Sequence, residues 1–396
     1  MSTIKSFKRT ALIAALALSA TAAHADIKVG FNSDMSASGA AEQGLSSYYG
    51  VQAAIEDINN KGGVLGQKLQ LIARDDVGQP PKAIQNMNEL IDNEKVVAVI
   101  GPANSGNALA WLHIPQRKKI PVISAVATST DITQRYADTD ANYIFRVSMV
   151  DREQIAMLVA YAVKSSKDKK IGFLVDNTGY GQQGLKDLQS IIALHGVKPV
   201  AVEQFGAKDT DMTSQLSKIK AQGTDTLIVY GLSDANGHVL RSMEKIDYFP
   251  TVLGSWTNIN TPMYRIAGQP LAGRFLFTAS TAEDSNPAAS RLSTELLKKY
   301  PNMTAFTTAA HGYDAVLMLA QAIKQANSTE GPKIQAALEN LDKVEGVVKT
   351  YEKPFDKKNH EALSVADFHL ARWEKNRVVT YQDEFTEALT AQDYKR

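Results

Sequence analysis

The sequence contains no cysteine, and its seven histidines are scattered along 396 residues. Without cysteine the chain can form neither a disulfide nor a thiolate nucleophile, and no lipid can be attached to a cysteine behind a leader peptide. The motifs of zinc proteases, α/β-hydrolases and P-loop nucleotide-binding proteins are also missing. We therefore expect no metal site, no cofactor and no catalytic centre.

Long apolar runs and an excess of either charge are missing too. Beyond the first 25 residues, no stretch reaches the roughly 20 apolar residues that a membrane helix needs. The 43 lysines and arginines nearly balance the 42 aspartates and glutamates. A nucleic-acid-binding protein needs a basic stripe, so we do not expect a nucleic-acid partner.

The first 25 residues have the composition of a cleaved secretory signal peptide. Lys5, Lys8 and Arg9 form a basic start, residues 11–23 are apolar but too short to span a bilayer, and A-H-A at 23–25 is a small-residue cleavage site. We expect the protein to be exported and to act in a bacterial periplasm. The remaining 371 of the 396 residues exceed the size at which single domains divide, so two domains are expected.

Strand-like and helix-like segments alternate along the chain in two successive sets. Amphipathic helical patterns separate the strands, which is typical of βαβ units in a parallel sheet. We predict an α/β protein with two doubly wound lobes and a ligand-binding cleft where the carboxyl ends of their strands face each other. The expected strands lie at 27–31, 68–73, 96–100, 121–124 and 145–151 in the first set, and at 170–176, 199–205, 225–231, 251–255 and 274–279 in the second.

From residue 285 onward the chain is mostly helical, with helices expected at 285–299, 306–326 and 330–341. Too few strands accompany these helices for a third α/β domain, so they should pack on one of the two lobes. The alternating segment 363–374 would extend the edge of a sheet. The chain should therefore cross several times between the lobes, at short loops that can act as a hinge.

Two segments of the first set combine small and hydroxyl-bearing residues directly after a strand: GPANSG at 101–106 and SAVATS at 124–129. Each precedes a polar helix start, where unpaired backbone amides and the helix dipole favour negative charge, and the hydroxyls add donors. One such segment alone would be explained as a helix cap formed by Ser105 or Thr128. Two of them in successive strand–helix units predict a pocket for a small anion, most simply a carboxylate.

The segment GYGQQG at 179–184 fits the G-x-G-x-x-G pattern of dinucleotide-binding enzymes, with Glu203 about 20 residues further on. The residues Asp176, Asn177 and Thr178 lie between the apolar part of the preceding strand and the first glycine, so the turn is longer than that pattern needs. Soluble nicotinamide cofactors are scarce in the expected compartment, and no catalytic acid or base stands out. We favour the alternative that this turn presents Tyr180 to the cleft, with glycines that allow close approach.

Several motifs, in their order along the chain, resemble one family. They are VGFNSDMSASG (29–39), GVQAAIEDINNKGGVLGQKL (50–69), GPANSG, SAVATS, VDNTGYGQQG (175–184) and HGYDAV (311–316). Together with the signal peptide, they are similar to the branched-chain amino-acid (leucine-binding) type of periplasmic substrate-binding protein, which serves ABC importers. The resemblance covers nearly all residues after the signal peptide.

This resemblance implies a type I periplasmic binding fold, in which three hinge crossings join the two lobes. It divides the chain into signal peptide 1–25, a first lobe of 26–147 plus 278–360, and a second lobe of 148–277 plus 361–396. The implied protein is a monomeric, non-enzymatic solute-binding protein that closes on a small carboxylate and delivers it to an ABC permease in the inner membrane. A sensor subunit that presents its closed form to a membrane receptor is the alternative.

Ligand-binding positions follow from the same resemblance. In amino-acid-binding members the GPxxSG serine and the threonine after the next strand hold the ligand's α-carboxylate, which implies Ser105 and Thr128 here. The family's tyrosine after the first strand of the second lobe packs on the ligand side chain and matches Tyr180. The further positions that we expect in the site are Asn104, Val126 and, in the loop after the first strand, Gln43.

One position departs from the family pattern. Amino-acid-binding members place an acidic residue after the strand that corresponds to 251–255, where it pairs with the ligand's ammonium, but this chain has Trp256 there. Asp234 or Glu42 could supply the missing charge, and Trp256 could instead be a core residue. We predict that Trp256 faces the ligand, and that the ligand is an apolar or aromatic carboxylic acid rather than a branched-chain or other amino acid.

Overall fold

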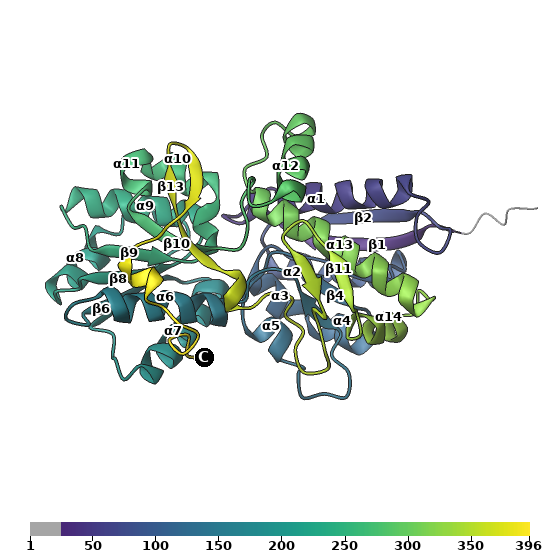
Figure 1. Ribbon diagram of the computed structural model, residues 1–396, viewed down its shortest axis with the longest axis horizontal. Coiled ribbons are helices and arrows are strands. Elements are labelled where there is room, and N and C mark those ends of the chain that lie inside the picture. The colour runs from purple at the N-terminus through teal and green to yellow at the C-terminus, as the bar shows by residue number, and fades with distance from the viewer. Residues whose placement is uncertain (1–24) are drawn as a thin grey trace, which may run out of the picture.

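The structure is a computed structural model that describes residues 25–396. The predicted signal peptide lies almost entirely outside the described residues. Two α/β lobes lie side by side, and the chain passes repeatedly between them (Figure 1). None of the helices within 25–396 combines the length and apolarity needed to cross a membrane.

The first lobe is built on a five-stranded parallel sheet in the order β2-β1-β3-β4-β5. Its strands are β1 (Ile27–Ser33), β2 (Leu69–Asp75), β3 (Ala98–Ile100), β4 (Val122–Ser124) and β5 (Ile144–Arg146). The connecting helices are α1 (Ala41–Asn60), α2 (Pro80–Asn88) with its π-helical continuation η1 (Glu89–Asn93), α3 (Ser105–Trp111), α4 (His113–Lys118) and α5 (Asp131–Gln134).

Both faces of this sheet are apolar and buried. Val99 and Val122 belong to one hydrophobic cluster with residues of α2, α3 and α4, whereas Ile100 and Ile123 belong to another with residues of α1. Because successive side chains of a strand point to opposite faces, helices cover the sheet on both sides. The loops that follow the strands therefore meet at the edge facing the second lobe.

The second lobe contains a seven-stranded sheet in the order β14-β13-β10-β9-β8-β6-β7. Strands β6 to β10 are parallel, and β13 and β14 join them as an antiparallel pair beside β10. The strands are β6 (Ile171–Asp176), β7 (Ala201–Phe205), β8 (Thr226–Tyr230), β9 (Thr251–Gly254), β10 (Phe275–Ala279), β13 (His369–Glu374) and β14 (Arg377–Thr380). The helices are α6 (Asp151–Ser165), α7 (Gly179–Leu194), α8 (Thr213–Ala221), α9 (Ser233–Lys245), η2 (Trp256–Ile259), α10 (Thr261–Ala267) and α11 (Gln269–Ala272), with α15 (Glu384–Glu387) near the C-terminus.

The helices after β10 return to the first lobe, as predicted. They are α12 (Pro287–Lys299), α13 (Phe306–Ala326) and α14 (Gly331–Leu338), followed by the hairpin β11 (Lys343–Glu345) and β12 (Thr350–Glu352). Helix α13 lies against α1 (Figure 1). A Cβ atom on Gly50 of α1 would lie 1.9 Å from the carbonyl oxygen of Ala309, so only glycine allows this approach.

Three segments connect the lobes, at 147–150, 280–286 and 361–364. Arg146 ties the first crossing to the third, because its Nε and Nη2 each donate to a carboxylate oxygen of Glu361 at 2.7 Å. Arg146 is fully buried, which makes this paired hydrogen bond a rigid connection. The predicted α/β class with two doubly wound lobes is confirmed, whereas the residue bounds of the lobes stay a prediction.

The structure corrects several predicted elements. The helix expected at 106–116 is divided into α3 and α4 at Leu112, because Pro115, in the first turn of α4, has no amide hydrogen to bond the carbonyl oxygen of Trp111. The strand expected at 363–374 begins only at His369, because Ser364 and Asp367 form a capping box around a short 3-10 turn, η3 (Val365–Asp367). β13 is not the sheet edge, since β14 lies outside it, and the β11–β12 hairpin was not predicted.

Candidate ligand-binding cavity between the lobes

A small cavity lies between the two lobes, and only about 10 Å³ of it is open to the centre of a water molecule, so the lobes are closed tightly around it. Seven of the eight residues predicted for the site line it, and larger hollows within the described chain hold none of the eight. Ser105, Thr128 and Trp256 are each 2% exposed, so a ligand can enter only when the lobes separate. The lining consists of Gln43, Ala103, Asn104, Ser105, Val126, Thr128, Tyr180, Leu232, Trp256 and Thr257.

The first wall of the cavity offers free backbone donors. Helix α3 begins at Ser105, and the side chain of its N-cap Asn104 accepts hydrogen bonds from the amides of Gly106, at 2.8 Å, and Asn107, at 3.3 Å. Within residues 25–396, the amides of Ser105 and Thr128 donate to no protein acceptor. Two free amides and the adjacent hydroxyls are a suitable set of donors for a carboxylate.

The loop that carries Thr128 is not a helix start, and this part of the prediction is wrong. The next helix, α5, begins only at Asp131 and has four residues. Arg146 holds the loop instead, because its Nη1 donates to the carbonyl oxygens of Ala127, at 3.3 Å, and Ser129, at 2.9 Å. The amide of Ser129 donates to Ser105 Oγ at 3.2 Å, which joins the two predicted segments directly.

The second wall presents an aromatic ring whose hydroxyl group is already bonded. Tyr180 Oη donates to Ser255 Oγ at 2.5 Å, Ser255 Oγ lies 3.1 Å from Thr257 Oγ1, and Thr257 Oγ1 donates to the carbonyl of Gly231 at 2.8 Å. This series of hydrogen bonds ends on the carbonyl oxygen of Gly231, so each of the three hydroxyls donates to the next oxygen in the series. Tyr180 therefore offers the cavity its ring rather than a free hydroxyl.

Trp256 and Gln43 add side-chain donors to the cavity. The backbone amide of Trp256 donates to Gln154 Oε1 at 3.1 Å, and its ring lies 5.7 Å from that of His311. The indole N–H makes no hydrogen bond within the described residues. Gln43 Nε2 is buried and has no acceptor among them either. A ligand with an acceptor atom would satisfy the buried donor of Gln43.

No charged side chain lines the cavity, and the two acids considered as substitutes lie elsewhere. Glu42 forms an ion pair across the lobes with Arg265 at 2.9 Å and accepts a hydrogen bond from Thr304 Oγ1 at 2.6 Å. Asp234 is absent from the lining, and burial, followed by the nearby charge of Glu42, raises its pKa. The structure therefore brings seven predicted residues together and leaves Asp234 outside.

Glycines of the GYGQQG segment are in close contact with protein. A Cβ atom on Gly179 would lie 3.0 Å from the Cα of Gly106 across the cleft, and one on Gly184 would lie 2.4 Å from the ring of Tyr230. Glu203, the candidate ribose-binding acid, pairs with Lys218 at 3.1 Å. These contacts favour the interpretation of close approach over a dinucleotide site.

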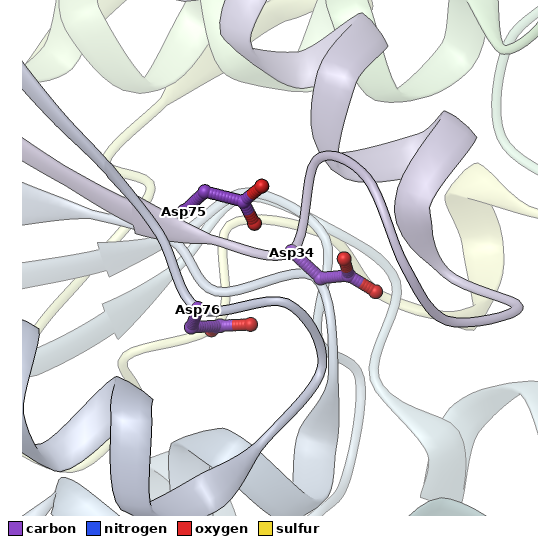
Figure 2. A group of neighbouring side chains, drawn as sticks. All are labelled: Asp34, Asp75 and Asp76. Carbon is purple, nitrogen blue, oxygen red and sulfur yellow. The ribbon is translucent and has the colours of Figure 1, made fainter.

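A group of three carboxylates lies where β1 and β2 end (Figure 2). One oxygen from each of Asp34, Asp75 and Asp76 falls within 4.8 Å of the others. Asp34 and Asp75 accept hydrogen bonds from loop amides and from serine hydroxyls, and burial raises the pKa of Asp76 to about 6. These donors explain the first two carboxylates as loop-fixing groups, so we assign no metal here.

Three lining residues were not predicted. Ala103 lies inside the GPANSG segment, Thr257 follows Trp256, and Leu232 is the second residue after the strand β8. Position at the carboxyl end of a strand was the signal that could have identified all three.

Comparison with known proteins identifies the family to which the chain belongs. The family model described as "Periplasmic binding protein" matches residues 26–377. A Leu/Ile/Val-binding protein of Rhizobium johnstonii is 28% identical over 381 residues, covering 95% of this chain and 99% of the relative.

Solved structures share the fold. A type 1 periplasmic binding protein of Bordetella pertussis superposes with a TM-score of 0.80 at 25% identity, covering 90% of this chain and 99% of the other. The substrate-binding protein of a branched-chain amino-acid transporter from Streptococcus pneumoniae, solved with isoleucine, gives a TM-score of 0.75 at 24% identity, over 90% of this chain and all of the other.

Proposed function

The chain belongs to the periplasmic binding protein family, in its branched-chain amino-acid type, and from this membership we propose that it is the solute-binding component of an ABC importer. It acts as a monomer in the periplasm, closes on one small carboxylate without covalent chemistry, and delivers it to a membrane permease. The relatives are named as binding proteins for leucine, isoleucine and valine, and one of them also for threonine and alanine, and the three segments that connect the lobes could act as the hinge that such delivery requires.

The donor set of the first wall is the observation that carries this proposal. Ser105 and Thr128 are buried residues that line the cavity, and within residues 25–396 their amides have no protein acceptor, so both are available to an anion that would be costly to bury without such partners. We propose that Ser105 and Thr128 hold the carboxylate, with Asn104 and Val126 shaping the wall beside them. Gln43 supplies one further donor.

The second wall supports an apolar or aromatic acid as the ligand. Tyr180 and Trp256 offer ring faces, and an ammonium in this lining would meet no acidic side chain. A cation–π contact with Trp256 would compensate only in part, by about 0.5–2 kcal/mol. We therefore place apolar and aromatic carboxylic acids ahead of plain amino acids.

Calorimetry tests this proposal with leucine, valine, benzoate-like acids and phenylpropanoid acids. We expect an aromatic acid to bind more tightly than leucine, and Ser105→Ala to weaken whichever acid binds. Tight leucine binding without a response to aromatic acids would contradict the ligand class. Binding that Ser105→Ala leaves unchanged would contradict the carboxylate site.

A further inference from the structure

A buried carboxyl group lies directly behind the wall of the cavity. Asp151 is the first residue of α6, at the end of the 147–150 crossing, and its side chain is fully buried. Its backbone amide donates to the carbonyl oxygen of Thr128 at 2.8 Å. Asp151 therefore adjoins the residue that we propose to hold the ligand's carboxylate.

Hydrogen bonding leaves one oxygen of this carboxyl group without a donor. Asp151 Oδ1 accepts from the hydroxyl of Tyr230 at 2.6 Å and from Gln154 Nε2 at 3.4 Å, whereas Oδ2 has no partner among the described residues. Burial raises the pKa of Asp151 to about 7, although the hydroxyls of Thr128 and Tyr230 act in the opposite direction. A buried carboxylate oxygen without a donor is unfavourable, so a donor brought close to it is stabilising.

The same group also adjoins the second wall. The ring of Tyr230 stacks on that of Tyr180, with centroids 4.9 Å apart and an angle of 28° between the planes. After burial, the charge of Asp151 is the next largest cause that raises the pKa of Tyr180. Asp151 thus contacts Thr128 on one side. On the other side it bonds Tyr230, whose ring stacks on that of Tyr180.

We propose that Asp151 is a specificity-determining residue, which pairs with a hydrogen-bond donor that the ligand carries on the carbon next to its carboxylate. Thr128 indicates this position, because it lines the cavity, its carbonyl oxygen accepts from the Asp151 amide at 2.8 Å, and its hydroxyl lies close enough to Asp151 to lower the pKa of that group. The donor is a hydroxyl or an ammonium group. The inference rests on the proposed function and refines its ligand class. A hydroxyl donor agrees with the proposed preference for aromatic acids over amino acids, whereas an ammonium donor would reverse that preference, because Asp151 would then be the acid that is missing at Trp256.

The test uses three acids that share one skeleton: phenylalanine with an ammonium, 3-phenyllactate with a hydroxyl and 3-phenylpropionate with no donor. Calorimetry on the full mature chain compares the wild type with Asp151→Asn. We expect at least one donor-bearing acid to bind the wild type about 10- to 100-fold more tightly than 3-phenylpropionate. In Asp151→Asn this ratio should fall to less than about threefold.

Tyr230→Phe is the matched control. It removes a hydroxyl that bonds Asp151 but keeps the carboxyl group, so the preference for a donor should persist. A purely structural role of Asp151 would weaken all three acids equally and leave the ratio unchanged, which would overturn the inference. Equal binding of the three acids by the wild type would overturn it as well.

The failure of the proposed function has a different signature. If the wild type binds none of the three acids, nor the corresponding leucine, 2-hydroxy-4-methylpentanoate and 4-methylpentanoate, the ligand class itself is wrong. If Asp151→Asn does not fold, as circular dichroism would show, Asp151→Ser with the same ligands decides between the two outcomes. Comparison of the Kd values of phenylalanine and 3-phenyllactate also identifies whether the cavity selects an ammonium or a hydroxyl donor.

Discussion

Gly179 begins α7 on one side of the cleft and faces Gly106, the second residue of α3, on the other side. A Cβ atom added at Gly179 would lie 3.0 Å from the Cα of Gly106 and 3.6 Å from its nitrogen. Carbon atoms in van der Waals contact sit about 3.5–4.0 Å apart. Gly179→Ala would therefore force α3 and α7 apart by roughly half an ångström when the lobes close.

The expected cost follows from this contact. Added methyl groups in a tightly packed place cost about 1–3 kcal/mol, and only the closed arrangement of the lobes contains the contact. Because the ligand binds between the closed lobes, the apparent Kd should rise by the same free energy, about 5- to 150-fold. The second lobe itself should not lose stability, since alanine is favoured over glycine in a helix by about 1 kcal/mol.

Calorimetry with the acid that binds the wild type most tightly measures the change in Kd, and circular dichroism on heating measures the stability. Ser190→Ala, an exposed substitution in the same helix, is the control and should leave the Kd unchanged. A Kd within twofold of the wild type for Gly179→Ala would refute the reasoning. So would a weaker Kd accompanied by a lower melting temperature, because that result would indicate damage to the second lobe.

Three further substitutions test separate contacts. Ser105→Ala should weaken binding about 10- to 100-fold in calorimetry, since a hydrogen bond to a charged group contributes about 1.5–3 kcal/mol; a smaller loss would mean that the hydroxyl does not contact the ligand. Glu42→Gln should weaken binding less than about fivefold, and not at all in about 0.5 M salt, because the ion pair with Arg265 is 37% and 60% exposed. Burial raises the pKa of Asp151 from 3.8 to about 7, so its contribution to stability is fully present below pH 3.8 and is lost as the pH rises through about 7. In urea unfolding, the free energy of unfolding of Asp151→Asn should therefore rise relative to that of the wild type by up to about 4 kcal/mol between pH 4 and pH 8. An equal difference between the two proteins at both pH values would contradict this.

Long helices rich in apolar residues could be predicted from the sequence. The helices expected at 151–165 and 306–326 match α6 and α13 residue for residue. Both are long, and their apolar residues recur along their whole length, so local and tertiary preferences agree. The predicted bounds are wrong where a short polar motif determines the local structure, as Ser364 and Asp367 do in the strand predicted at 363–374. An alternating pattern cannot reveal that a serine side chain will cap a turn.

The site was predictable to the extent that it depends on the ends of strands. Ser105, Thr128, Tyr180 and Trp256 each follow a strand closely, and parallel strands bring such positions to one edge. Asp234 also follows a strand, but it is the second residue of α9, and the rotation of that helix directs its side chain outside the cavity lining. Asp151 escaped notice because burial and a missing hydrogen-bond donor are properties of the folded chain alone.

Arg146 connects the candidate site to the hinge. One nitrogen of its guanidinium group holds the carbonyls of Ala127 and Ser129, which flank Thr128, and the other two hold Glu361 at the third crossing. The group is fully buried and planar, so the loop and the crossing cannot shift independently without breaking a charge-assisted hydrogen bond. The donors proposed for the carboxylate are therefore fixed relative to the axis about which the lobes close. We therefore expect selection among carboxylates to depend on what the second lobe and Asp151 bring to those donors, rather than on movement of the donors themselves.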